Sequence, residues 1–118
     1  MTYTIDIWLR GTDYATTHER TVALVPAAWT DVDVEGVLKD MLRALDREKN
    51  PGADERDVFL RGFSWIVTPS KHGGVVIAIE MQVGAVIGGP FEIDPKTLDE
   101  MIGRVMGRGG MKKEEWRM

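Results

Sequence analysis

His18 and His72 are the first residues to consider for chemistry, because imidazole is a general base near neutral pH and a common metal ligand. Each lies in a segment with turn composition, and neither has a second histidine or a carboxylate at a ligand spacing such as HExxH. We interpret both as solvent-exposed turn residues. The sequence therefore predicts no metal site and no cofactor.

Hydroxyl nucleophiles occur at Ser64 and in the tripeptide Ser70-Lys71-His72. Neither a GxSxG elbow nor an SxxK pair surrounds them, so nothing would activate the hydroxyl. Cysteine is absent, which removes thiol catalysis, disulfides and cysteine-based zinc sites together. We expect no catalytic residues and lean against an enzyme.

Two further patterns resemble ligand sites but have ordinary explanations. The glycine-rich run 84–89 has neither the GxGxxG nor the GxxxxGK spacing, and no phosphate-binding lysine follows it. Asp31, Asp33 and Glu35 stand at the start of a predicted helix, where the helix dipole stabilises acids without any function. Neither pattern predicts a cofactor or metal.

The composition bounds the class of protein. A chain of 118 residues is long enough for one domain without staples. The net charge of −4 disfavours a general nucleic-acid binder, which needs clustered basic residues facing the phosphates. No apolar run is long enough to span a membrane, and we expect a cytoplasmic protein that starts near Met1. The domain should cover residues 1–110, followed by a basic tail at 111–118.

Hydrophobic periodicity predicts the elements that must position any site. Side chains alternate through 2–10, and 20–25 reads as the returning strand of a hairpin; 56–67 and 75–81 form a second hairpin around the turn 71–74. Helices are expected near 30–48 and 94–107, where Thr30 and Asp94 are suitable N-caps. The aliphatic residues of these elements should form the core: Ile5, Ile7, Leu9, Leu38, Leu42, Leu60, Ile77, Ile79, Ile102 and Val105.

A short echo relates the two halves, because DIWLRG at 6–11 returns as DVFLRG at 57–62. Each copy falls on a predicted strand that precedes a second strand and a helix. The predicted fold is therefore α+β: a duplicated ββα-ββα chain with an antiparallel sheet of four or five strands and two helices on one face. About thirteen extra residues near 82–90 would form a short fifth strand or a buried loop.

Alternation places several aromatic residues and arginines opposite the aliphatic face that the helices should cover. Large exposed apolar patches mark contact surfaces, and Trp and Arg dominate interface energetics. The cover could be the insert and tail of the same chain, a second copy in a homodimer, or a foreign partner. The predicted protein interface consists of Trp8, Arg10, Phe59, Arg61, Phe63 and Trp65.

The leading functional hypothesis is a non-catalytic, cytosolic protein-binding module, of which an inhibitor or immunity-type protein that neutralises a basic partner is one form. The alternative is a small-ligand-binding protein or compact enzyme whose pocket lies between the sheet and the insert at 82–92. A deep pocket with convergent polar groups would favour the alternative, whereas a flat aromatic patch would favour the binding module.

Overall fold

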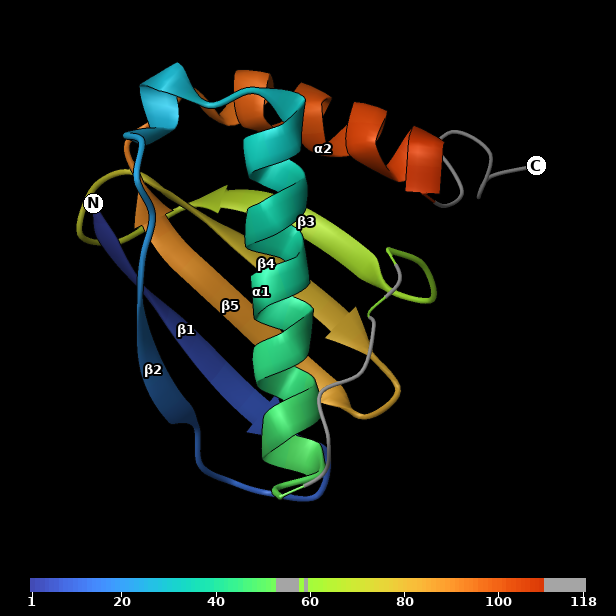
Figure 1. Ribbon diagram of the computed structural model, residues 1–118. Coiled ribbons are helices and arrows are strands. Elements are labelled where there is room, and N and C mark those ends of the chain that lie inside the picture. Colours follow the sequence, from blue (N-terminus) through green and yellow to red (C-terminus); the bar gives the residue numbers. More distant parts are fainter. Residues whose placement is uncertain (53–57, 59, 110–118) are drawn as a thin grey trace.

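The computed structural model describes residues 1–52, 58 and 60–109. Five strands, one short 3-10 helix and two α-helices make up this part of the chain (Figure 1). Their order is β1 (Thr2–Leu9), β2 (Thr16–Thr21), η1 (Pro26–Ala28), α1 (Asp31–Lys49), β3 (Ser64–Pro69), β4 (Val75–Met81), β5 (Gly84–Phe91) and α2 (Pro95–Gly109). The predicted tail at 111–118 lies outside the described residues.

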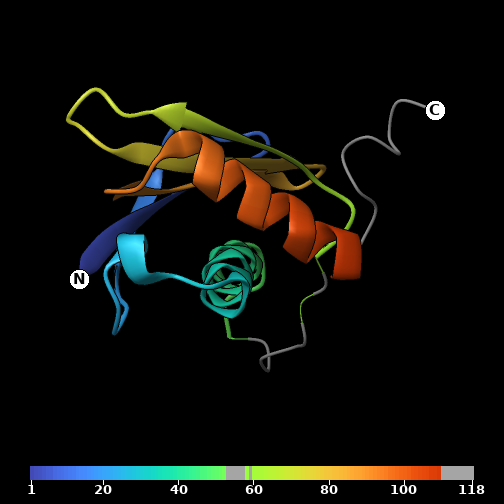
Figure 2. The same cartoon turned by 90° about the horizontal axis from the view of Figure 1, so that it is seen from above.

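The strands form one antiparallel sheet in the order β2-β1-β5-β4-β3. Both helices lie on the same face of this sheet, α1 over β1 and β5 and α2 toward β3 (Figures 1 and 2). The predicted α+β class and the antiparallel sheet with two helices on one face are confirmed. No helix in the described ranges is long and apolar enough to cross a membrane.

The predicted ββα-ββα duplication is wrong. The first half contributes two strands before its helix, whereas the second contributes three. The fifth strand expected near 82–90 is confirmed as β5, but it lies at the centre of the sheet rather than as an insert in a second repeat. The two copies of the echo also differ in structure. Asp6 to Leu9 belong to β1, but Leu60, Arg61 and Gly62 precede β3 and lie outside any strand. The positive φ of Gly62, 77°, marks the break.

Helix α1 begins as its sequence predicts. Thr30 and Asp33 form a capping box, in which the Asp33 carboxylate accepts a hydrogen bond from Thr30 N at 2.8 Å and the Thr30 side chain faces the Asp33 backbone N–H. Thr30 Oγ1 also donates to the same carboxylate at 3.0 Å. A buried stripe then faces the sheet, with Leu38 and Met41 fully enclosed. Gly88 of β5 lies under Met41, and a Cβ at that glycine would stand 2.9 Å from Met41 Sδ. The absent side chain therefore lets α1 approach the sheet closely.

Helix α2 is held at both of its flanks. Asp94 accepts a hydrogen bond from Thr97 N at 3.0 Å, as expected for an N-cap. Near the other end, Arg104 makes a forked contact with Asp31, with Nε–Oδ2 and Nη2–Oδ1 distances of 3.0 Å. This contact raises the pKa of the Arg104 guanidinium and joins the last turns of α2 to the start of α1.

One hydrophobic core fills the space between the helices and the sheet. Nine of the ten predicted aliphatic residues are buried in it, and Leu9 packs against it while partly exposed. Alternation in the first strand placed Tyr3 on the buried face with Ile5 and Ile7, which is confirmed, but sequence reasoning did not assign Trp29 and Phe91 to the core. The Phe91 ring lies 5.0 Å from the ring of Tyr3 and 5.0 Å from that of Trp29. This aromatic group fills the end of the core where β1, β5 and the connection to α1 meet.

Candidate functional site

The structure does not bring the predicted interface residues together on one face. Phe63 and Trp65 are only 6% and 7% exposed and belong to the hydrophobic core. Trp65 pairs with Ile79 of β4, and Ile79 is a buried residue of the helix-covered face. The expectation that Trp65 faces away from the helices is therefore wrong. Alternation counted from residue 56 failed because the strand begins only at Ser64, after the break at Gly62.

The other predicted interface residues have different surroundings. Trp8 lies half-buried on the sheet face opposite the helices. Arg10 and Arg61 are exposed, and Arg10 Nε donates a hydrogen bond to the Gln82 carbonyl at 2.6 Å. Phe59 lies outside the described residues. Of the aromatic residues in the predicted interface, Trp8 remains partly accessible on the sheet face opposite the helices, whereas Phe63 and Trp65 belong to the core.

The face of the sheet opposite the helices, hereafter the open sheet face, has no covering layer in the described part of the chain (Figure 2). Ile66, Ala78 and Ile87 stand side by side across β3, β4 and β5. On β1, Asp6 stands opposite Ile87, and Trp8 stands opposite Ala85 of β5. Ile66 is 58% exposed, and the others are half-buried. The centre of the open sheet face is therefore apolar.

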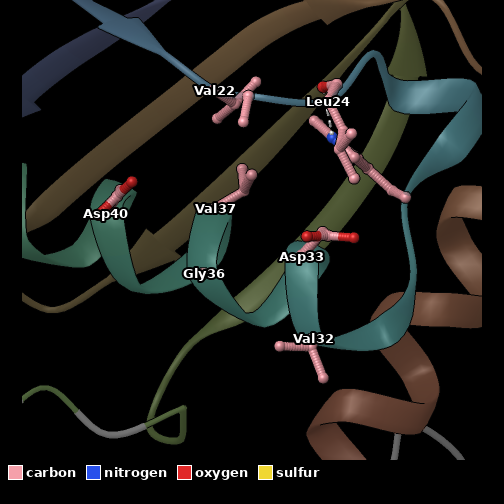
Figure 3. A pocket seen from close by; sticks show the side chains of 9 residues that line it. Val22, Leu24, Val32, Asp33, Gly36, Val37 and Asp40 are labelled. Atoms are coloured by element: carbon pink, nitrogen blue, oxygen red, sulfur yellow. Dashed lines mark hydrogen bonds between the residues drawn. The ribbon is translucent and has the colours of Figure 1, made fainter.

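A separate pocket of about 320 Å³ lies between α1 and the segment that joins β2 to α1 (Figure 3). Val22 of that segment and Val37 of α1 point toward one another across it, and Trp29 forms part of its wall. Trp29 Nε1 donates a hydrogen bond to the Leu24 carbonyl at 3.1 Å. Because Trp29 also packs on the core, the connecting segment that forms this wall is anchored.

Two carboxylates line the same pocket, those of Asp33 and Asp40. They flank Val37 on one face of α1, at the i, i+4, i+7 spacing of a helix (Figure 3). Asp40 Oδ1 lies 3.8 Å from Arg43 Nη1, whereas Asp33 is oriented by the capping box described above. No basic residue is found among the described residues that line the pocket.

Tyr3 lies in the aromatic part of the core, beside Phe91. Its hydroxyl is buried, with the side chain only 2% exposed, and it has no hydrogen-bond partner among the described residues. Burial, reinforced by the Asp40 carboxylate and opposed by Arg20, raises the pKa of the Tyr3 hydroxyl to about 12. The neutral phenol is therefore the form present at physiological pH.

The histidines lie in different surroundings from one another. His72 is in the turn between β3 and β4, as predicted. The expectation of a turn is wrong for His18, which belongs to β2 and whose Nε2 lies 3.5 Å from Glu48 Oε2. Glu48 also accepts a hydrogen bond from Thr16 at 2.8 Å. These contacts join the edge strand β2 to the last turns of α1. Within the described ranges, no three His, Asp or Glu residues form a group that could hold a metal ion.

Sequence reasoning missed the pocket entirely. Asp33 was interpreted only as a helix-start acid, and Asp40 was not singled out. The available signal was their shared face with Val37. The apolar run from Val22 to Val25 was assigned to a returning strand at 20–25, which is wrong because the strand β2 ends at Thr21 and the run belongs to the connection that forms the pocket. The alternative pocket beside 82–92 has no such basis, because residues 84–91 are part of the sheet itself.

Comparison with known proteins adds no assignment: no protein-family model, curated protein or solved structure matches this chain.

Proposed function

We propose that this protein is a non-catalytic binding module that contacts another protein through its open sheet face. The partner is either a second copy of the chain or a foreign protein, and the experiment below separates the two. The observation that carries the proposal is the apolar row Ile66, Ala78 and Ile87, which crosses three adjacent strands on the side away from both helices.

An antiparallel sheet can leave one face in water, but the outward residues are then usually polar. The outer part of this face follows that rule, since Thr17 of the edge strand β2 donates a hydrogen bond to Asp6 at 2.6 Å. Across β3, β4 and β5 the rule is broken by the apolar row. An apolar centre with a polar margin is the usual anatomy of a protein interface.

Trp8 strengthens the proposal because it adds a large aromatic side chain next to the row. Tryptophan is among the residue types that contribute most to binding energy when an interface buries it. Its half-buried position leaves part of the indole for a partner to cover. The proposal thus retains Trp8 of the interface predicted from sequence, while Phe63 and Trp65 contribute to the core beneath the sheet.

Matched charge substitutions on the open sheet face test the proposal. Ile66→Glu places a charge in the apolar row, and Thr21→Glu places the same charge on the same face at the opposite edge strand. Both positions are exposed, so both variants should retain the wild-type circular dichroism spectrum. Sedimentation velocity should show a dimer that Ile66→Glu dissociates and Thr21→Glu does not. A monomeric wild type would direct the experiment to foreign partners.

For a foreign partner, the absence of cysteine in the chain allows a direct footprint. Single thiols introduced as Ile66→Cys and Thr21→Cys can be labelled with a maleimide in buffer and in cell lysate. The lysate should protect the thiol at position 66 and leave the one at position 21 reactive. Equal labelling at both positions, combined with a monomeric wild type, would refute the proposed function.

A further inference from the structure

We propose that the pocket between α1 and the β2–α1 connection is a second binding site, and that it takes a lysine or arginine side chain of a partner polypeptide. The site is distinct from the open sheet face, because it lies on the helix side of the molecule (Figures 1 and 3). It does not depend on the function proposed above.

Charge selects the cation. Asp33 and Asp40 both reach the pocket, and no described residue that lines it is basic. The capping box uses Asp33 Oδ2 and orients the carboxylate, while Oδ1 accepts no hydrogen bond from the described residues. The two acids stand seven residues apart on α1, about 10 Å along its axis, so a single cation contacts one of them directly. A guanidinium or ammonium group at either carboxylate would form charge-assisted hydrogen bonds, which are stronger than neutral ones, and the other carboxylate adds to the negative potential.

Asp40 already has an ion-pair partner, Arg43, which would compete only weakly with an incoming cation. Arg43 is three residues further along the same helix, and its Nη1 lies 3.8 Å from Asp40 Oδ1. Exposed ion pairs of this kind contribute little to stability, because water screens them and both side chains are flexible. The Arg43 contact is therefore no barrier to a second cation that reaches Asp40 from the pocket side.

The apolar walls select an aliphatic stem. Val22 and Val37 face one another across the pocket, with the carboxylates on either side of Val37 (Figure 3). Lysine and arginine bury their methylene groups along apolar surface while the charged end stays among polar atoms. A volume of about 320 Å³ is at the lower end of the range for small-molecule sites. It accordingly suits one side chain rather than a nucleotide or a larger cofactor.

The rim of the pocket favours a polypeptide over a free amine. Five large hydrophobic side chains are exposed in the described part of the chain, and two of them, Leu24 and Val32, line this site. A free amine small enough for the pocket would leave these side chains in water. A peptide segment with apolar residues beside its basic residue would cover them. The lining of the pocket therefore points to a basic side chain flanked by apolar ones.

Gly36 is a position at which a larger side chain would fill the pocket and block it. It lines the pocket on α1, and a Cβ at this position would meet nothing within 4 Å. Gly36→Ala should therefore fold normally and leave the pocket open, whereas Gly36→Leu should extend a side chain into it. For the charge, Asp40→Asn removes a lining carboxylate. Glu35→Gln removes the same charge from a neighbouring residue that pairs with Lys39 at 3.6 Å and does not line the pocket.

The probe is an array of acetylated hexapeptides that carry one arginine or lysine among leucine and valine residues in all orders. A matched array has glutamine in place of the basic residue. The wild-type protein should bind members of the basic array and not their glutamine counterparts. Asp40→Asn should weaken binding about tenfold, as expected for loss of a charged hydrogen-bond partner. Gly36→Leu should abolish binding, while Gly36→Ala and Glu35→Gln should retain it.

Three results would overturn the inference. Equal binding of the glutamine array would show that charge does not select the ligand. Equal weakening by Glu35→Gln would show a general charge effect rather than a site. Arginine amide that binds as tightly as the best hexapeptide would show a site for small amines instead of a polypeptide. Ile66→Glu should leave binding to the array unchanged, so this test and the test of the open sheet face can fail separately.

Discussion

The close approach of α1 to the sheet at Gly88 makes a specific prediction about packing. A Cβ at this position would lie 2.9 Å from Met41 Sδ, 3.2 Å from Cε and 3.3 Å from Cγ. Met41 is fully buried, so its side chain has little space into which it can move. The φ of Gly88 is not positive, so alanine is free of backbone strain there. We therefore expect Gly88→Ala to destabilise the fold by about 1–3 kcal/mol, the usual cost of overpacking.

A double-mutant cycle isolates the cause. Met41→Ala alone should cost about 2–5 kcal/mol, because it leaves a cavity between α1 and β5. In that background the methyl group of Gly88→Ala meets no methionine and fills part of the cavity. It should then be neutral or stabilising, which gives a coupling free energy of about 1–3 kcal/mol between the two sites.

Urea unfolding followed by far-UV circular dichroism measures all four free energies of the cycle. The slopes of unfolding free energy against urea should agree among the variants, which shows that the same surface is exposed in each case. If Gly88→Ala costs the same amount with methionine and with alanine at position 41, the two effects are additive. The close contact with Met41 would then not be the reason why glycine stands at position 88.

Five other substitutions test separate parts of the structure. Tyr3→Phe should raise the free energy of unfolding by about 1 kcal/mol at pH 7, because it removes a buried hydroxyl without a partner. Since the pKa of Tyr3 is raised from 10.0 to about 12 on folding, stability should also fall as the pH rises through this interval, and Tyr3→Phe should lack that component in urea titrations at each pH. Trp65→Ala should cost about 3–5 kcal/mol and Ile66→Ala less than about 1 kcal/mol, and equal costs would contradict the assignment of their side chains to opposite faces. Gly103→Ala should stabilise α2 by about 0.5–1 kcal/mol, since a Cβ there meets nothing within 4 Å, whereas Gly84→Ala should lower the melting temperature because its Cβ would meet the backbone of β1.

The helices show how much local signals can predict. The capping residues Thr30 and Asp94 both stand at helix starts, and the observed helices lie within two residues of the expected ends. Caps and the 3.6-residue stripe act over a few residues, so a single sequence carries them. The strand β4 was also located at its observed bounds, because alternation and flanking turns define it locally.

The segment 56–67, which contains the second copy DVFLRG, shows what local sequence patterns cannot predict. Phe63 and Trp65 were assigned to the outer face by counting alternate residues through 56–67. The chain leaves the strand conformation at Gly62, so the count before that residue has no bearing on the orientation after it. A register error of one residue exchanges the two faces of a strand, and burial of the whole sheet decides which face is inside.

The two proposed binding surfaces also differ in how far the sequence alone could predict them. Alternation in β1 was sufficient to place Trp8 opposite the aliphatic residues, because that strand is regular from Thr2 to Leu9. The pocket required tertiary structure, since Val22 and Val37 are fifteen positions apart in the sequence and meet only when the connection packs on α1 (Figure 3). A sequence pattern shows which residues share an element but does not show which elements become neighbours.

Composition, periodicity and capping residues by themselves determined the α+β class, the helices and most of the aliphatic core. Only the tertiary structure decided that residues 84–91 form the centre of the sheet. The segment has few strand-forming side chains, and three of its eight residues are glycines, at positions 84, 88 and 89. Its pairing with β1 and β4 supplies what local propensity lacks, because hydrogen bonds to strands on both sides and burial under α1 stabilise it.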